Sequence, residues 1–107
     1  MVEFPDKRIY LYYEHIDFRK GIKGLTNIVI TELSDTDLYD SLYLFFSKDR
    51  RQVKILEIEK DNIWLYHNKL IGYRFIFPRS DKTVKISYTE LKLILKTVEL
   101  VAHRSNK

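Results

Sequence analysis

The chain has 107 residues, of which 45% are hydrophobic, and a net charge of +4, which suits a single domain that buries its own core. It contains no cysteine, and this excludes thiolate metal sites, iron–sulfur clusters, thiol catalysis and disulfides. Apolar runs such as Leu42 to Phe46 are far shorter than the ~18 residues that a membrane span requires, and the N-terminus lacks the layout of a secretion signal. We therefore expect one cytoplasmic domain over residues 1–107, with no membrane partner.

The first elements in the chain are expected to be a strand and a helix. Residues 8–13 are rich in β-branched and aromatic side chains, which is typical of a strand. Asp17 is placed to cap a helix over roughly 18–33, where apolar residues recur at spacings of three and four. Gly21 and Gly24 lie inside that helix and should each cost it ~1 kcal/mol relative to alanine. They indicate close approach of another backbone or a first turn that is not regular α-helix.

A run of strands follows, and a second helix comes after it. The strand pattern covers these segments in turn: 41–47, 53–59, 62–68, 72–77 (stopped by Pro78) and 83–87. Ser87 and Glu90 then form a capping box, in which the side chain of each residue accepts a hydrogen bond from the backbone N–H of the other at the start of the helix. The helix that they open carries Leu91, Ile94, Leu95 and Val98 on one face. The tail 103–107 is expected to fray.

This order of elements predicts an α+β domain. Consecutive strands with short turns favour an antiparallel meander of five to six strands, and the helix near the N-terminus and the helix at the C-terminus are expected to pack on one face of it. The predicted core contains these apolar residues: Ile22, Leu25, Val29, Leu44, Phe46, Leu56, Leu65, Phe75, Leu91 and Leu95.

The residue types that could support catalysis lack the necessary spacing. The histidines at 15, 67 and 103 have no second histidine at metal-ligand spacing, and no Gly-rich segment has the length and ending of a phosphate loop. Asp35, Asp37 and Asp40 are close in sequence, but we interpret them as solvated loop residues and not as a metal cluster. We therefore expect no enzyme activity, no catalytic residue, no metal site and no cofactor.

Basic residues are the better functional candidates. Arginine and lysine hold phosphates, and neighbouring aromatic rings can stack on bases, but the aromatic residues that alternate over 64–77 are also typical of a core face. An ordinary solvated surface would explain the charges as well. The hairpin that contains Lys48, Arg50 and Arg51 is the preferred candidate, because exposed loops commonly carry function. The full set of candidate nucleic-acid-binding residues is Arg19, Lys20, Arg50, Arg51, Lys54 and Arg74.

Several motifs follow one another in a recognisable order. The segment 17–25 contains Asp-Phe-Arg-Lys-Gly and Gly-Leu; Leu-Phe-Phe follows at 44–46, Arg50 stands before Lys-Ile-Leu at 54–56, and Arg-Phe-Ile-Phe-Pro lies at 74–78. Over roughly 8–98, this order resembles the TnpB accessory proteins of insertion-sequence-66 transposons. Tyr66 and Phe77 stand where that family usually has tryptophan, and Tyr73 replaces a usual glycine.

The resemblance implies a non-enzymatic accessory protein of bacterial transposition, encoded beside a transposase and a second small protein of the element. It assigns no catalytic residue. Three hypotheses follow: a protein that binds DNA, the transposase or both; a protein–protein adaptor without DNA contact; or an inert remnant of a mobile element. One contiguous patch of the basic candidates would favour nucleic acid, and scattered charges would favour the adaptor.

Overall fold

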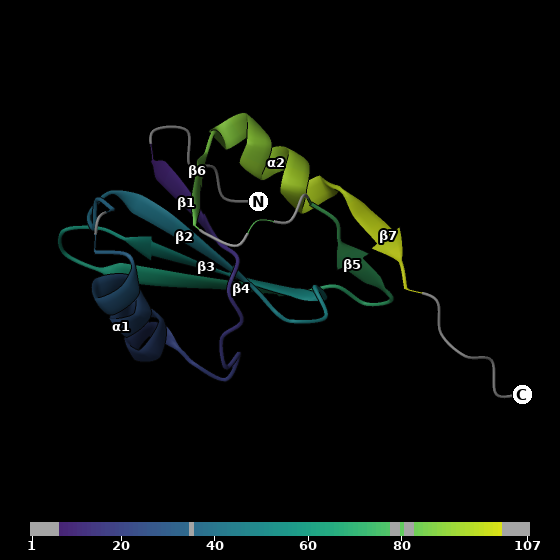
Figure 1. Cartoon of the computed structure of the whole chain (residues 1–107), viewed down its shortest axis with the longest axis horizontal. Helices are drawn as coiled ribbons and strands as arrows, with labels where there is room; N and C mark the ends of the chain where they lie inside the picture. Colours follow the sequence, from purple (N-terminus) through teal and green to yellow (C-terminus); the bar gives the residue numbers. More distant parts are fainter. Residues whose placement is uncertain (1–6, 35, 78–79, 81–82, 102–107) are drawn as a thin grey trace, which may run out of the picture.

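The computed structural model describes residues 7–34, 36–77, 80 and 83–101 (Figure 1). Pro78, His103 and the rest of the expected tail lie outside the described residues. The elements, in chain order, are β1 (Arg8–Tyr12), α1 (Ile22–Glu32), β2 (Ser41–Phe46), β3 (Gln52–Ile58), β4 (Ile63–Lys69), β5 (Tyr73–Phe75), β6 (Val84–Ile86), α2 (Tyr88–Lys96) and β7 (Val98–Leu100).

The main sheet has five strands in the order β4-β3-β2-β1-β6 (Figure 1). The fold is α+β with a mostly antiparallel five-stranded sheet, as expected, but only β2, β3 and β4 form a meander. Strands β1 and β2 run parallel, whereas every other neighbouring pair in this sheet is antiparallel. The cause is the crossover through α1, which returns the chain to the end of the sheet from which β1 started.

A second, two-stranded sheet pairs β5 with β7. The expectation that the 72–77 strand joins the meander was therefore wrong, and so was the placement of Val98 on the second helix. Helix α2 ends at Lys96, and Thr97 has extended backbone angles (φ −92°, ψ 103°). The Thr97 carbonyl accepts a hydrogen bond from the Ile76 N–H at 3.0 Å, so the chain leaves the helix as a strand beside β5. We call this two-stranded sheet the ribbon.

The two helices cover opposite faces of the main sheet, not one face as expected (Figure 1). On one face, α1 packs Leu25, Ile28 and Val29 into a cluster with Tyr43 and Leu56. The sequence contained a sign of this arrangement: all six residues of β2 are apolar or small and all are buried, which is typical of a strand covered on both faces.

The other face is covered by α2 and by the segment that contains β5. Leu91 of α2 joins Phe75 and Phe77 against Leu44 and Phe46 of β2. Most of the expected core residues are buried, while Leu65 and Leu95 are partly buried. Ile22 was wrongly assigned to the core: it is 43% exposed, because it stands in the first turn of α1.

The starts of the two helices differ in how well the sequence predicted them. The capping box was correct: the Glu90 N–H donates to Ser87 Oγ at 3.0 Å, and the Ser87 N–H donates to Glu90 Oε1 at 2.8 Å. Asp17 does not cap α1, which begins at Ile22 with Gly21 as an N-cap that has no side-chain hydrogen bond. The helix therefore begins later than the expected start at residue 18, and its first hydrogen bond, from the Leu25 N–H to the Gly21 carbonyl at 2.9 Å, is that of a regular α-helix. At Gly24, an added Cβ would lie 3.1 Å from the side chain of Lys20.

Candidate nucleic-acid interface

The strand register brings the basic candidates to one end of the sheet. At this end β1 and β2 finish, β3 begins and β4 finishes, as the pairs Tyr12↔Phe45 and Gln52↔Lys69 show. The β1–α1 loop and the β2–β3 turn both leave the sheet here. We call it the basic end, and its bases are Arg19, Lys20, Lys48, Arg50, Arg51, Lys69 and Arg74. Its acids are Glu14, Asp17, Asp49 and Glu99.

The opposite end of the sheet is predominantly acidic. Acids from the loop before β2 and from the β3–β4 turn gather there, and they outnumber the nearby bases Lys7, Arg8 and Lys60. These acids are Asp37, Asp40, Glu59 and Asp61. Lys7 lies among several of these carboxylates, 3.1 Å from Glu59 and 3.9 Å from Asp40. The molecule is therefore electrostatically polarised along the strands, which orients it in the field of a charged partner.

The β2–β3 turn at the basic end is organised by Asp49. Its carboxylate accepts hydrogen bonds from the Ser47 hydroxyl at 2.7 Å and from the Arg51 N–H at 3.0 Å. These hydrogen bonds, the one from Ser47 foremost, lower the pKa of Asp49 below its usual value. Arg50 occupies the left-handed region with φ +60°. The turn thus has a defined shape that fixes where its basic side chains begin.

Arg50 joins this turn to the chain segment that contains β5. Its guanidinium donates to the Phe77 carbonyl at 3.2 Å and lies 4.2 Å from the centre of the Phe77 ring. Its own carbonyl accepts from the Phe75 N–H at 2.8 Å. Arg50 is half-buried, so this candidate has a structural role in addition to its charge.

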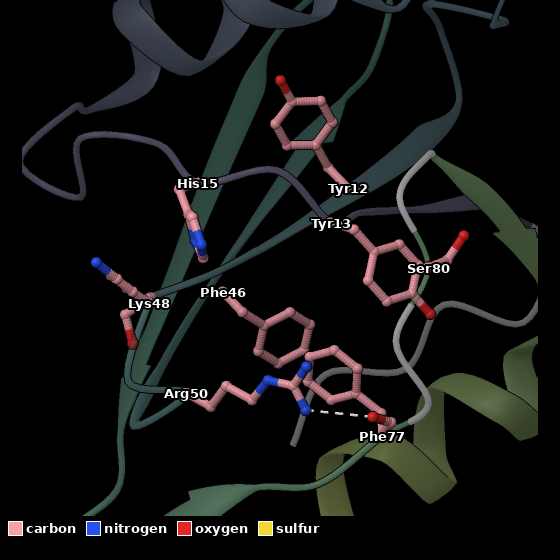
Figure 2. Close-up of a pocket in the computed structure, with 9 residues that line it drawn as sticks. Tyr12, Tyr13, His15, Phe46, Lys48, Arg50, Phe77 and Ser80 are labelled. Atoms are coloured by element: carbon pink, nitrogen blue, oxygen red, sulfur yellow. Dashed lines mark hydrogen bonds between the residues drawn. The ribbon is translucent and has the colours of Figure 1, made fainter.

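A small cavity opens beside Arg50 (Figure 2). In this view His15 points from the β1–α1 loop toward the rings of Phe46 and Phe77, while the ring of Tyr12 points away. Lys48 lies at the rim and is exposed. Burial raises the pKa of the Tyr13 hydroxyl, and the nearby charge of Arg50 opposes that change.

A second, more open hollow lies on the outer side of the same turn. It has a volume of about 320 Å³, and Lys48, Arg50, Arg51 and Arg74 contribute to its wall. Asp49 and Glu99 line it too: Glu99 forms an ion pair with Arg74, and Asp49 lies 4.0 Å from Arg51. The hollow therefore has a smaller positive excess than its arginines alone would give.

The remaining candidates lie in and under the β1–α1 loop. Arg19 is bound by both carboxylate oxygens of Asp17, at 2.7 and 2.9 Å, and this pairing lowers the pKa of Asp17. Lys20 is exposed. Lys54 is only 6% exposed, and its ammonium group donates to the carbonyls of Phe18 at 2.6 Å and Lys20 at 2.7 Å.

The candidates therefore do not form one contiguous patch. Arg50, Arg51 and Arg74 surround the outer hollow, Arg19 and Lys20 are displayed on the loop, and the charge of Lys54 is used to hold that loop. The structure adds residues that the sequence analysis did not select: Lys69, which is exposed at the end of β4, and His15 and Lys48. Lys48 already lay within the preferred hairpin, so the sequence held a usable signal for it although it was not among the six selected candidates. The sequence contained no comparable signal for His15.

The chain was compared with known proteins. A family model described as IS66 Orf2-like protein matches residues 7–105. The chain belongs to this family. The match spans every helix and strand of the structure and confirms the resemblance seen in the motifs. No curated protein and no solved structure matches the chain. Family membership makes it an accessory protein associated with an insertion sequence.

The motifs of this IS66 Orf2-like protein acquire distinct structural roles. The Asp17–Gly21 motif forms the loop over Lys54, and the motif that joins Arg50 to residues 54–56 forms the turn and the strand that supports this loop. Other charged groups are dispersed: Asp37 forms an ion pair with Arg8 at 3.0 Å, and Asp35 lies outside the described residues. Within the described ranges, no group of three or more His, Asp or Glu side chains is placed to hold a metal ion, and no helix is long and apolar enough to cross a membrane.

Proposed function

We propose that this IS66 Orf2-like protein is a DNA-binding accessory factor of bacterial transposition that acts in the cytoplasm and contacts the phosphate backbone with its basic end. The observation that carries the proposal is the segregation of charge along the sheet, with basic side chains around the outer hollow and acids at the far end. A polyanion is attracted to the first end and repelled by the second, so the charge distribution selects an orientation on DNA as well as a contact surface.

Exposed lysines are the best candidates for phosphate contacts. In the part of the chain that the structure describes, Lys20, Lys48 and Lys69 are exposed and have no carboxylate partner within 4.0 Å. Arg51 pairs with Asp49 only at the limiting distance. Phosphate contacts of this kind hold the backbone without reading sequence, so we expect binding that is largely independent of sequence and decreases steeply with salt.

A titration of a labelled duplex at two salt concentrations tests the proposal. Each phosphate contact should contribute roughly 0.9 to the slope of log K against log salt. The variant Lys48→Ala/Arg51→Ala/Lys69→Ala should therefore bind more weakly and lower this slope by up to about 2.7. Lys60→Ala, which removes an exposed lysine at the opposite end, should retain the wild-type slope. Absence of duplex binding even at low salt would reject direct DNA contact.

A protein–protein adaptor is the second candidate. The division of the basic candidates into separate groups favours it, and the ribbon supports it as well. Tyr73 and Leu100 are paired across the ribbon, and they are 44% and 69% exposed. Ile71, just before β5, is 81% exposed. Adjacent exposed apolar side chains are typical of a protein–protein contact. The transposase and the second small protein of the element are the partners to test by co-purification; an inert remnant would bind neither these proteins nor DNA.

The proposed role is binding and not catalysis. Incubation of purified protein with supercoiled DNA and magnesium or manganese should leave the DNA intact. Cleavage that survives repurification and is lost when Asp37 or Asp40 is changed to asparagine would show that the protein is a nuclease.

A further inference from the structure

The small cavity beside Arg50 has the dimensions of a site for one compact chemical group (Figure 2). Its volume is about 110 Å³, well below the ~300 Å³ at which pockets for whole small molecules begin. Phe46 and Phe77, with ring centres 4.4 Å apart, form an apolar side of it. A whole nucleoside is too large for this space, whereas a group that consists of one central atom and its oxygens fits.

The polar groups of the cavity favour an anion. Arg50, Lys48 and His15 supply N–H donors, and no carboxylate is found among the described residues that line the cavity. Asp49, the acid of the turn, lines the outer hollow and not this cavity. Its carboxylate accepts hydrogen bonds from the Arg51 N–H and from the hydroxyl of Ser47, which itself lines the cavity. Positive groups in a partly enclosed space with lower dielectric attract an anion more strongly than the same groups in bulk water.

Arg50 is positioned before any ligand arrives. Its contacts with the carbonyl and ring of Phe77 fix the plane of the guanidinium, and the planar fork of N–H donors of an arginine matches the spacing of phosphate oxygens. Because the side chain is already ordered, binding costs less conformational entropy than it would for a mobile arginine. Lys48, exposed at the rim, is flexible enough to approach the same group from the solvent side.

We propose that this cavity is a phosphate-binding site, in which Arg50 and His15 donate to the oxygens of one phosphate group and Lys48 closes over it. The inference deepens the proposed DNA-binding function and rests on that function for the source of the phosphate. A backbone phosphodiester and a terminal phosphate share the required chemistry. The other basic side chains of this end would then contact phosphates on either side of the one that enters the cavity.

The first test uses the full chain and inorganic phosphate alone. Amide chemical shifts should change in a saturable way at His15, Ser47 and Lys48, beyond the change produced by chloride at matched ionic strength. The double variant His15→Ala/Lys48→Ala should bind phosphate roughly tenfold more weakly, with an unchanged melting temperature because both residues are exposed. Lys60→Ala should titrate like the wild type. An absence of saturable shifts, or an affinity that the double variant does not change, would overturn the proposal.

Duplex DNA then distinguishes the sources of the phosphate. A duplex closed by a hairpin loop at each end has only backbone phosphates, and open duplexes with 5′-phosphate or 5′-hydroxyl ends test the terminal group. Weaker binding of the closed duplex by His15→Ala, which keeps the exposed lysines, assigns a backbone phosphate, and a loss by this variant that is confined to the 5′-phosphorylated duplex assigns a terminal one. Saturable phosphate binding without any duplex binding by the wild type would keep the cavity assignment and reject the DNA-binding function. Duplex binding by the wild type without saturable phosphate binding would reject the cavity assignment and keep the DNA-binding function.

Discussion

The ammonium group of Lys54 lies 2.6 Å from the carbonyl oxygen of Phe18 and 4.8 Å from the centre of the Phe18 ring. A second hydrogen bond, of 2.7 Å, reaches the Lys20 carbonyl. One buried cation thus joins the third residue of β3 to the loop that leads into α1. The contact accounts for a lysine in the middle of a strand whose neighbours in the chain are buried and apolar.

We predict that Lys54→Met destabilises the protein by about 1–3 kcal/mol, because two part-buried carbonyl groups lose a charged hydrogen-bond partner. Methionine replaces most of the side-chain volume, so the loss reports the hydrogen bonds and not a cavity. Urea denaturation measures it. Lys20→Met is the matched control and should unfold like the wild type, since Lys20 contributes only its backbone carbonyl to this contact. A Lys54 variant as stable as the wild type would show that the contact has no structural importance.

Asp49 makes the β2–β3 turn sensitive to acid. Hydrogen bonds from Ser47 and from the Arg51 N–H lower its pKa in the folded protein, so the folded state binds a proton less readily than the unfolded chain. The stabilising contribution is complete above the unfolded pKa of about 3.9 and is lost as the pH falls through the lower, folded value. Because the side chain is 61% exposed, we expect the contribution to stay below about 1 kcal/mol.

The corresponding prediction is that Asp49→Asn flattens the decrease in stability below pH 4. Thermal denaturation between pH 2 and pH 7 compares it with the wild type, and Asp61→Asn, in the exposed β3–β4 turn, serves as the matched control. An Asp49 variant whose stability falls as steeply as that of the wild type would place the acid-sensitive group elsewhere.

Arg50 combines a structural side chain with an unfavourable backbone conformation. A non-glycine residue at φ +60° is strained by about 1–2 kcal/mol. Arg50→Ala should lose the contacts with Phe77 and keep this strain, whereas Arg50→Gly loses the same contacts and relieves it. We therefore predict that both variants are less stable than the wild type and that the glycine variant is more stable than the alanine variant by about 1 kcal/mol. An alanine variant that equals or exceeds the glycine variant in thermal denaturation would contradict the left-handed geometry.

Local patterns in the sequence predicted the elements better than their arrangement. The capping box at Ser87 was correct because both of its partners lie within one turn of helix. The sheet topology was not, since strand pairing depends on the path of a long crossover and the pattern within β1 does not reveal which strand lies beside it. Strand β7 was missed because Val98 continues the apolar spacing of α2, and only the contact of Thr97 with Ile76 shows that the helix has ended.

For the candidate site as well, the sequence predicted individual residues better than their surroundings in the fold. Sequence reasoning could identify Arg50, Arg51 and Arg74 as basic residues in predicted strands and turns, and the fold brought them together. It could not distinguish an exposed lysine from one that binds carbonyls, because Lys54 finds its partners in a loop more than thirty positions earlier. The cavity residue His15 was also beyond prediction, as it meets Arg50 only through the parallel pairing of β1 and β2.

The ribbon permits a test that separates DNA contact from partner contact. Tyr73 and Leu100 are exposed partners on opposite strands. The double variant Tyr73→Thr/Leu100→Thr removes their apolar surface, and the β-branched threonines that it introduces favour a strand. We predict that this double variant binds duplex DNA like the wild type, because no charge changes, and co-purifies less with the transposase. Trp64→Thr is the matched control: Trp64 is exposed on β4 near the acidic end, and its loss should affect neither measurement. If the ribbon variant retained full co-purification, the adaptor contact would have to lie on another surface. If it lost duplex binding, DNA would contact the ribbon itself, and the basic end could no longer be the whole interface.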